Sequence, residues 1–566
     1  TAEIRALLTG PGGMFEVVTE EVNGRSLQVY KNRLGSLREV ATAAQGRGDA
    51  EDFIVHGERR IGFASFVALA NSISRTLRDE FGVGHGDRVA VLSQNNPEWC
   101  LAFWATVDVG AILVGLNGWW KADEILYGLQ DSGAKILVAD AKRFERIAGD
   151  LDQAPDLEHV FLIDRDPVGH DPRLHHFDEL TTSPSPEPPD IPIAEEDPAV
   201  IFYTSGTTGR PKGAISTHRN MIANLQNTLY SAAAGAMRGS SVLPSGGGQN
   251  VSLLTSPLFH VSGCHSSLVV GMLAGVRIVI PDGKFEPEKA LELLERERVT
   301  VWATVPTMIW RVCEYPKRHD YDTSTVTSVA FGGSPSAEEL QRKIRETFPN
   351  VRTTSNAYGL TESSSVATVI SGEDAVAKPT SVGPPVPTVE VRIVEPTGEE
   401  VAGGETGEVL IRGPIIMPGY WNKPDDTAKA VDDDGWLHTG DIGYVDADGF
   451  LYITDRAKDM IIRGGENIYC VEIENRLVEH PGVADAAVVG APHPALGEEV
   501  KAVIQLEPGE TVSADDLRTW VRTTLADFKV PTHVEMTYDP LPRNASGKLL
   551  KNVLRGEGDV GFEELM

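Results

Sequence analysis

The chain has 566 residues, of which 82 are acidic and 51 basic, so its formal net charge is −31. This excess of negative charge argues against a nucleic-acid partner, because phosphate backbones are themselves anionic. A chain of this length exceeds what one hydrophobic core usually serves, so we expect two or more domains. The apolar fraction of 41% is that of an ordinary soluble enzyme.

The four cysteines show none of the spacings typical of metal sites, and so few in a long chain favour reduced thiols in the cytoplasm. The first residues, TAEIRALLTGPGG, lack a basic segment followed by an apolar one, so we expect no signal peptide. Asp108 and Arg277 interrupt the most apolar stretches, which therefore predict buried elements and no transmembrane segment. Peripheral membrane contact and a homodimer stay open.

Apolar runs predict buried strands at residues 89–92, 136–138, 160–163, 276–280 and 301–305. Helical patterns lie between them, for example over 63–81 and 287–298. This alternation predicts an α/β fold with doubly wound, mostly parallel sheets. From about residue 380 short strands and Gly/Asp turns predict a β-rich subdomain. After residue 455 a helix near 472–479 and a strand near 486–489 predict a small α+β domain.

The stretch YTSGTTGRPKGA, residues 203 to 214, places hydroxyls, glycines and Lys212 together on one loop. Glycines let backbone N–H groups turn toward one point, and the hydroxyls and the lysine add further donors. The loop is therefore suited to binding an anion, most simply phosphate. Its spacing differs from a Walker A loop, because no glycine four residues earlier leads into Gly-Lys-Ser/Thr.

Further motifs follow in a fixed order. They are PLFHVSG (257–263), FGGSP (331–335), NAYGLTE (356–362), GWLHTGD (435–441), DRAKDMIIRGGENI (455–468) and LPRNASGK (541–548). Together with the loop, these motifs resemble the adenylate-forming superfamily, which includes acyl-CoA synthetases, nonribosomal adenylation domains and luciferases. The resemblance extends from about residue 50 to 555. It implies an enzyme that uses ATP to turn a carboxylic acid into an acyl-adenylate, releases pyrophosphate, and then transfers the acyl group to the thiol of CoA.

The resemblance also implies which residues bind the nucleotide. The β- and γ-phosphates would be held by the loop residues Thr204, Ser205, Gly206, Thr207, Thr208 and Lys212. The adenine would lie against Tyr358 and be bordered by Gly332, Gly333, Ser334, Asn356, Ala357 and Gly359. Thr361 would contact the α-phosphate, and Glu362 would be the ligand of Mg²⁺, which proteins commonly hold with few carboxylates plus phosphate oxygens and water.

Three residues near the C-terminal part of the chain complete the predicted nucleotide site. Asp441 would accept hydrogen bonds from both ribose hydroxyls, a role suited to a carboxylate, and Arg456 would approach the same sugar. Lys548 would bridge the carboxylate and the α-phosphate during adenylation. The catalytic set implied by the resemblance is Lys548, Glu362, Thr204 and His260.

The same motifs predict a large domain over residues 1–455 and a small mobile domain over 456–566, with a hinge near Lys458. In the pose for adenylation Lys548 would face the α-phosphate. In the pose for thioester formation the segment IIRGGENI would replace it, and a narrow tunnel for CoA would be lined by His260, Arg463, Gly464, Gly465 and Glu466. Glycines permit the close backbone approach that a thin pantetheine arm requires.

The acyl pocket would be lined by small and apolar residues, namely His260, Val261, Cys264, Phe331, Gly332, Ala357, Gly359 and Leu360. His260 stands where amino-acid-activating relatives place an aspartate, which argues against an α-amino acid. Acetate-specific relatives carry tryptophan where this chain has Gly359, so the resemblance implies an acid larger than propionate. A medium- or long-chain fatty acid is the first expectation.

Several alternatives stay open. One is an aryl or other bulky acid, and another is an acyl-AMP ligase that loads a carrier protein, although the RGGEN segment favours CoA. A luciferase-like oxygenase shares nearly all these motifs. A non-enzymatic nucleotide-binding protein would be expected to have lost Lys548 or Glu362, and both are present.

Overall fold

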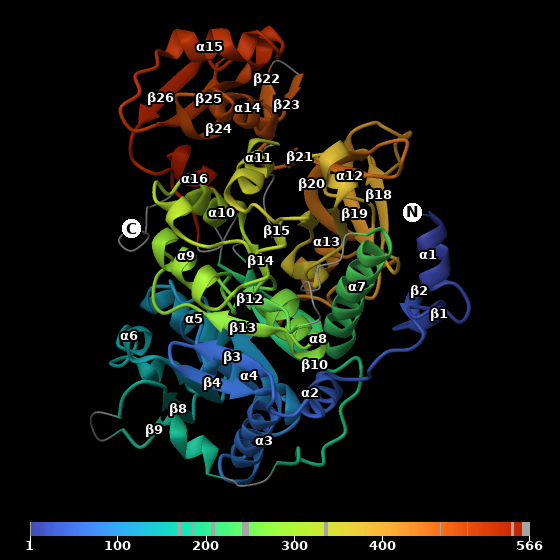
Figure 1. The fold of residues 1–566 in the computed structure, drawn as a ribbon, viewed down its shortest axis with the longest axis vertical. Coiled ribbons are helices and arrows are strands. Elements are labelled where there is room, and N and C mark those ends of the chain that lie inside the picture. Colours follow the sequence, from blue (N-terminus) through green and yellow to red (C-terminus); the bar gives the residue numbers. More distant parts are fainter. Residues whose placement is uncertain are drawn as a thin grey trace.

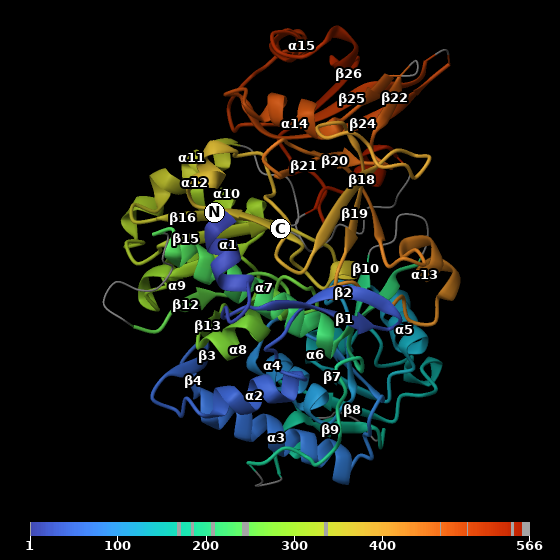
Figure 2. The ribbon, with the colours of Figure 1, turned by 90° about the vertical axis from the view of Figure 1, so that its right-hand side faces the viewer.

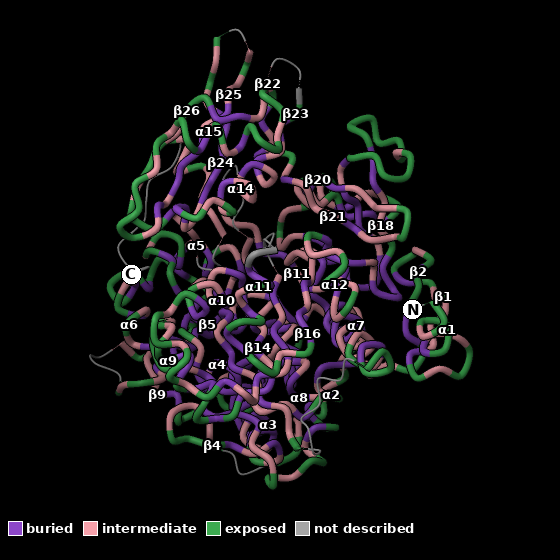
Figure 3. The backbone as a smooth tube through the Cα atoms, turned by 45° about the horizontal axis from the view of Figure 1, so that its top comes forward, coloured by how far each residue is buried: buried purple, intermediate pink, exposed green. Residues whose placement is uncertain are grey.

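The computed structural model describes residues 2–166, 171–182, 186–204, 210–239, 248–332, 338–463, 466–494, 496–544 and 548–556. They form a large body, with a smaller body on top of it (Figures 1 and 2). Buried residues concentrate inside the large body and along the strands of the small one (Figure 3). Among the described residues no helix has the length and apolar character needed to cross a membrane.

The first large sheet has seven strands, and its central strands are parallel. In spatial order the strands are β11 (Lys212–Thr217), β10 (Pro198–Thr204), β6 (Ile112–Gly115), β5 (Arg88–Leu92), β7 (Ile136–Ala139), β8 (His159–Leu162) and β9 (Leu174–His176). The β10–β11 pair is antiparallel and forms the two arms of the predicted anion-binding loop.

The second large sheet has eight strands, again parallel in its centre, with antiparallel pairs at both edges. Its order is β17 (Thr368–Ser371), β16 (Thr353–Tyr358), β15 (Ser328–Gly332), β14 (Val301–Thr304), β12 (Val251–Leu253), β13 (Arg277–Ile280), β3 (Asp52–His56) and β4 (Arg59–Gly62). The five strands predicted from apolar runs are confirmed to within one residue at each end.

Helices pack on both sheets, which explains why the central strands are apolar on both faces. The helices of the large body are α2 (Leu37–Gln45), α3 (Phe63–Asp79), α4 (Pro97–Asp108), α5 (Ala122–Ser132), α6 (Ala141–Phe144), α7 (His218–Met237), α8 (Val270–Ala274), α9 (Pro287–Arg296), α10 (Pro306–Cys313), α11 (Glu338–Thr347) and α12 (Glu373–Ala377). The start of α4 follows from its sequence: Asn96 caps the backbone N–H of Trp99, and Pro97 occupies the first turn. The main core joins side chains of both sheets with those of α2, α3 and α4.

The β-rich region predicted after residue 380 is confirmed as a four-stranded antiparallel sheet. It comprises β18 (Glu390–Val394), β19 (Gly407–Arg412), β20 (Leu437–Val445) and β21 (Leu451–Arg456), with α13 (Pro424–Ala430) between the second and third strands. At the N-terminus α1 (Ala2–Thr9) precedes a hairpin of β1 (Val17–Val22) and β2 (Arg25–Tyr30).

The small body contains a five-stranded sheet, β23 (Glu466–Ile468), β22 (Ile461–Arg463), β25 (Gly497–Leu506), β24 (Val483–His493) and β26 (His533–Thr537). Its helices are α14 (Cys470–Val478), α15 (Ala514–Arg522) and α16 (Lys551–Leu554). The predicted α/β fold with a small α+β domain is therefore confirmed. The exact division after residue 455 stays a prediction; it falls one residue before the end of β21, and residues 457–460 connect the two sheets.

Candidate active site

A cavity of about 780 Å³ lies between the large body and the small one. It opens at the carboxyl ends of the parallel strands β14, β15 and β16, where doubly wound sheets usually bind ligands. α7 and the loop at 256–262 form further walls, and Asn544 and Lys548 reach it from the small body. Its volume suits a nucleotide or a drug-sized ligand.

At one end of the cavity Tyr358 and Arg456 line the wall, and both contact the buried carboxylate of Asp441, a third predicted nucleotide residue. The phenol of Tyr358 donates a 2.7 Å hydrogen bond to Oδ2 of Asp441, and Nε of Arg456 lies 3.1 Å from Oδ1 of the same carboxylate. Asp441 and Arg456 face each other across the β20–β21 hairpin, so the fold fixes their pairing. Burial, and then the Asp441 charge, raise the pKa of Tyr358 well above its usual value. Tyr358 therefore stays protonated and holds the carboxylate in place.

The predicted placement of Asn356 beside the adenine is wrong for its side chain. Successive residues of a strand point to opposite faces, and Ser355 and Ala357 face the cavity. Asn356 is buried on the other face, where its amide donates to the carbonyl oxygen of Ser381 at 3.4 Å.

Four of the predicted nucleotide residues lie on the phosphate side of the cavity. Thr204, Lys212, Thr361 and Glu362 all line it. The ammonium of Lys212 lies 4.6 Å from the ring centre of Tyr420 and 3.5 Å from Oδ1 of Asp426. The predicted residues Ser205, Gly206, Thr207 and Thr208, together with Gly333 and Ser334, lie outside the described residues.

Tyr420 is a site residue that the sequence reasoning missed. Its hydroxyl donates a 2.8 Å hydrogen bond to Oε1 of Glu362, the predicted Mg²⁺ ligand, while its ring lies under Lys212. The only sequence signal is an aromatic residue after glycine in PGYWN, which does not reveal a partner 58 positions away. Tyr420 thus links the carboxylate and the cation of the phosphate side.

We expect Tyr420→Phe to raise the Mg²⁺ concentration needed for half-maximal pyrophosphate release about tenfold. Phenylalanine keeps the ring under Lys212 but removes the hydrogen bond to Glu362, and such bonds to a charged group contribute about 1.5–3 kcal/mol. Tyr444→Phe serves as the matched control, because that ring stacks on Tyr452 in the β20–β21 hairpin. A Mg²⁺ titration of Tyr420→Phe that overlays wild type would contradict the linkage.

Lys548 is presented to the cavity by the small body. Its backbone N–H donates to Oδ1 of Asn544 at 2.9 Å, and its carbonyl oxygen accepts from the N–H of Asn544 at 2.8 Å. Burial, followed by repulsion from Arg456, lowers the pKa of Lys548 to about 7. Burial and the Lys548 charge likewise lower the pKa of His260 to about 4, so His260 is a neutral imidazole near pH 7.

We expect kcat/KM for pyrophosphate release to fall as the pH rises above about 7. A lysine is charged below its pKa, so deprotonation of Lys548 in the free enzyme removes the cation that faces the phosphate side. His260 stays neutral across this range and adds no step. Lys548→Arg keeps its charge at every accessible pH. Its kcat/KM for pyrophosphate release, whatever its level, should therefore not decrease as the pH rises above about 7. An identical fall in Lys548→Arg would assign the titration to another group.

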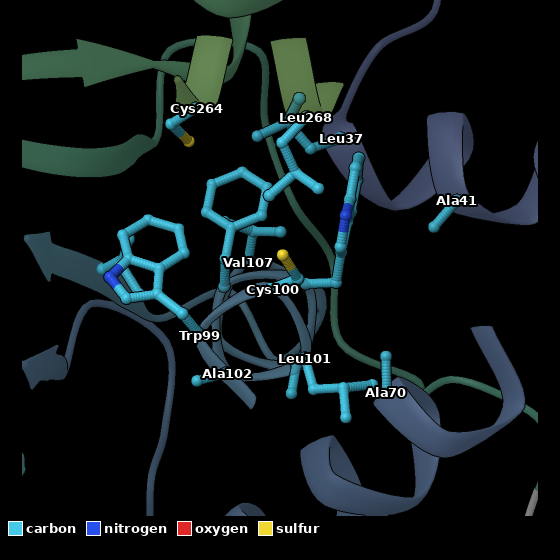
Figure 4. Close-up of a cluster of buried hydrophobic side chains, with 14 of the residues drawn as sticks. Leu37, Ala41, Ala70, Trp99, Cys100, Leu101, Ala102, Val107, Cys264 and Leu268 are labelled. Carbon is cyan, nitrogen blue, oxygen red and sulfur yellow. The ribbon is translucent and has the colours of Figure 1, made fainter. Parts of the chain in front are cut away.

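The acyl side of the cavity brings together most of the predicted pocket residues, namely His260, Val261, Phe331, Gly332, Ala357, Gly359 and Leu360. Cys264 was also expected there, and this is wrong. It begins the π-helix Cys264–Val269 and its thiol lies in the main core with Trp99, Cys100 and Leu268 (Figure 4). Burial accordingly raises the pKa of the Cys264 thiol well above its usual value.

Gly359 lines the cavity only through its backbone. A Cβ at this position would collide with the carbonyl oxygen of Ser365, and it would lie 3.3 Å from the amide nitrogen of Ala367. The absence of a side chain at 359 is therefore required by the close approach of residues 365–367. It is not evidence that a larger acid enters there, and the argument from tryptophan-bearing relatives fails for this chain.

Of the predicted CoA residues that the structure describes in full, His260 lines this cavity and Arg463 does not. Arg463 belongs to β22 and donates to the carbonyl oxygen of Phe528 at 3.5 Å. Gly464 and Gly465 lie outside the described residues, and only the backbone of Glu466, in β23, is described. Among the described residues of the small body, Asn544 and Lys548 line the cavity.

Comparison with known proteins agrees with this geometry. A model of the AMP-binding enzyme family matches residues 40–421, and a model of the AMP-binding enzyme C-terminal domain matches residues 472–548. The chain belongs to the AMP-binding enzyme family. The predicted membership of the adenylate-forming superfamily is confirmed.

Individual relatives indicate the class of reaction that this family member catalyses. A feruloyl-CoA synthase of Amycolatopsis sp. is 36% identical over 501 residues, which cover 88% of this chain and 94% of that one. A long-chain-fatty-acid–CoA ligase of Bacillus subtilis is 32% identical over 92% of this chain and 94% of its own. The crystal structure of ATP-bound MatB from Rhodopseudomonas palustris superposes with a TM-score of 0.80 at 30% identity, covering 92% of this chain and 98% of that one. This family member is an AMP-forming acid–CoA ligase that uses ATP and CoA.

The described residues fit the Mg²⁺ that this family uses. Glu362 is one carboxylate at the cavity wall, and among the described residues its side chain is hydrogen-bonded through Oε1 alone. Mg²⁺ commonly takes its remaining ligands from phosphate oxygens and water. When bound, the ion would neutralise phosphate charge during adenylation.

Proposed function

We propose that the chain activates a bulky, ring-containing carboxylic acid, such as an aryl acid, to its adenylate and transfers it to CoA. The observation that carries this proposal is the lining of the acyl side. Beside apolar residues it contains many hydroxyl side chains, namely Thr228, Ser231, Ser262, Ser266, Ser267, Thr353, Ser355 and Ser371. Five of these hydroxyls, those of Thr228, Ser231, Ser262, Ser266 and Ser267, already hydrogen-bond within the protein. A plain alkyl chain offers no hydrogen bond to Ser355 and Ser371, which pair across β16 and β17, and polar groups left without partners on burial are costly.

The fatty acid expected from the motifs is therefore replaced by the bulky-acid alternative. The names of the relatives support this choice without deciding it, because the feruloyl-CoA synthase is 36% identical and the long-chain-fatty-acid–CoA ligase 32%. A carrier protein as acceptor and a homodimer stay predictions.

In this proposal the residues around the cavity have separate roles in adenylation. Asp441, oriented by Tyr358 and Arg456, accepts from the ribose hydroxyls. Lys548 offsets the charge that develops between the carboxylate and the α-phosphate, while Glu362 and Lys212 act at the pyrophosphate end. Such preorganised charge is the main contribution an enzyme can make where two anions must react.

Thioester formation would need a second arrangement of the small body. Lys548 lines the cavity together with Ala457 and Lys458, and in this proposal CoA approaches after the small body has moved. Residues 457–460 connect β21 to β22 and include the proposed hinge at Lys458. The neutral His260, which belongs to the loop at 256–262 and lines the acyl side, would then lie between acid and thiol.

The deciding experiment measures pyrophosphate release for straight-chain acids of increasing length and for benzoic, phenylacetic and phenylpropenoic acids. Each acid is tested with and without CoA, and the acyl-CoA is identified by mass spectrometry. The proposal expects the highest kcat/KM among the ring-containing acids and acyl-CoA formation with release of AMP. Preference for straight-chain acids would restore the fatty-acid expectation, and adenylate without thioester would indicate a carrier protein as acceptor.

A further inference from the structure

Asp131 places a buried carboxylate at the end of a helix that least favours one. Its side chain is only 6% exposed, and α5 ends one residue later at Ser132. The last turn of a helix carries partial negative charge, and burial also disfavours an ionised carboxylate. The contacts that Asp131 makes therefore have to offset both costs.

Three donors converge on this carboxylate. Nζ of Lys423 lies 2.9 Å from Oδ1, and the phenol of Tyr203 donates to Oδ2 at 3.0 Å. The phenol of Tyr127, one turn earlier on α5, shares its proton between Oδ1 at 3.4 Å and the carbonyl oxygen of Pro211 at 3.1 Å. Burial, and then the Asp131 charge, raise the pKa of both phenols, so each keeps the proton that it donates.

The two phenols connect Asp131 with both arms of the predicted phosphate-binding loop. Tyr203 belongs to β10, which enters the loop, and it lines the cavity. Pro211, which accepts from Tyr127, lies on the arm that leaves the loop, directly before Lys212 at the start of β11. Asp131 therefore fixes where the two arms lie relative to α5.

The third donor connects Asp131 with the residue that holds Glu362. The backbone N–H of Lys423 donates to the carbonyl oxygen of Tyr420 at 3.3 Å, so both residues belong to one turn. The amide of Asn422 in the same turn donates to the backbone oxygen of Asp131 at 3.4 Å. Since Tyr420 donates to the carboxylate of Glu362, the position of this turn determines how the predicted Mg²⁺ ligand is held.

We propose that Asp131 is a positioning residue for the pyrophosphate end of ATP. It does not line the cavity, and it acts by holding the loop arms and the turn of Tyr420 together, so that Lys212 and Glu362 face the β- and γ-phosphates at once. This inference rests on the adenylation step of the proposed function and holds for any acid. An asparagine offers one acceptor oxygen where the carboxylate offers two, so it leaves donors unpaired and removes the counter-charge of Lys423. Misplacing groups that position a substrate lowers both binding and rate.

The test compares the binding of Mg²⁺–ATP and of AMP to the full-length enzyme by titration calorimetry, without any acid. AMP lacks the β- and γ-phosphates, so it reports on the rest of the nucleotide site and on the fold. We expect Asp131→Asn to raise the Kd of ATP about tenfold, the usual effect of losing one hydrogen bond to a charged group, and to change the Kd of AMP less than about twofold. Pyrophosphate release should fall, while acyl-CoA formation from synthetic acyl-adenylate should be unchanged.

Lys423→Met tests the same link from the partly exposed side of the pair, where the fold readily accepts the change. It should also raise the Kd of ATP and leave that of AMP unchanged. Adding Asp131→Asn to Lys423→Met should cost less than Asp131→Asn costs in wild type, because residues of one network act together.

Asp140→Asn is the matched control. Asp140 is also 6% exposed and pairs with Arg143, and neither residue lines the cavity. The control should leave both Kd values unchanged. An equal rise for ATP and AMP in Asp131→Asn and Lys423→Met, or no change for either nucleotide, would overturn the role of Asp131 and leave the proposed function intact. A wild-type enzyme that releases no pyrophosphate with any acid would instead refute the proposed function.

Discussion

Lys548→Ala should reduce acyl-adenylate formation by about 10²–10³-fold, the usual effect of removing one charged or donor group that acts on the transition state. The reason is the position of the residue: it is the lysine that the small body inserts into the cavity, beside Arg456 and Lys458. Thioester formation from supplied acyl-adenylate should be largely spared, because Lys548 would act only in the first arrangement.

The two half-reactions are measured separately, adenylation by pyrophosphate release and thioester formation by acyl-CoA produced from synthetic acyl-adenylate. Lys501→Ala is the matched control, because Lys501 also belongs to the small body but pairs with Glu535 on its sheet, 2.9 Å away. Equal loss in both half-reactions would refute two separate arrangements. A loss below about threefold in adenylation would refute the role of Lys548 altogether.

The strands of both large sheets could be predicted because helices cover both faces, so each central strand is a continuous apolar run. The β5 run Val89–Leu92 and the β7 run Ile136–Val138 are examples, and both are buried. Helix ends were less predictable. α3 ends at Asp79 and not at residue 81, because the chain turns at Gly82, whose φ of 63° lies in the left-handed region that favours glycine.

Motif order predicted that Asp441 and Arg456 would share a site, and the β20–β21 hairpin pairs them directly. It did not predict which way individual side chains point. Asn356 belongs to a motif of the site, and Cys264 directly follows one. Their positions on β16 and on the π-helix nevertheless direct both side chains into the protein interior. Contacts between distant segments, such as Tyr420 with Glu362, leave no pattern in one sequence.

The segment that packs against Gly359 gives a structural reason for this glycine that the motif alone does not reveal. The chain after it folds back tightly: Ser364 and Ser365 have φ of 50° and 105°, which residues with a side chain rarely adopt. Hydrogen bonds from other elements hold this segment, with Ser266 Oγ 2.6 Å from Ser365 Oγ, and Asn224 Oδ1 accepting from the N–H of Val366. The amide of Ala367 also donates to the carbonyl oxygen of Tyr358 at 2.8 Å. The segment therefore cannot yield easily to a side chain at 359.

Gly359→Trp should accordingly lose activity toward every acid and fold poorly, and should not shift the preference toward acetate. Its Cβ alone collides with a backbone carbonyl that neighbouring elements hold in place. Gly359→Ala isolates that first atom. Overpacking of this kind costs about 1–3 kcal/mol, so we expect a lower melting temperature and a similar fall in kcat/KM for short and long acids.

Gly403→Ala and Gly403→Trp are the matched controls for this prediction, because a Cβ at 403 meets no atom within 4 Å. Melting temperature, soluble yield and kcat/KM for acetic, hexanoic and phenylpropenoic acids are compared across the four variants. The controls should match wild type in all three quantities, since their added atoms project into open space. A folded Gly359→Trp enzyme that gains activity on acetic acid and loses it on the larger acids would contradict this expectation. Such a result would mean that residues 363–367 can move aside and that the indole enters the acyl side of the cavity. The residue at 359 would then limit the length of the acid that binds there.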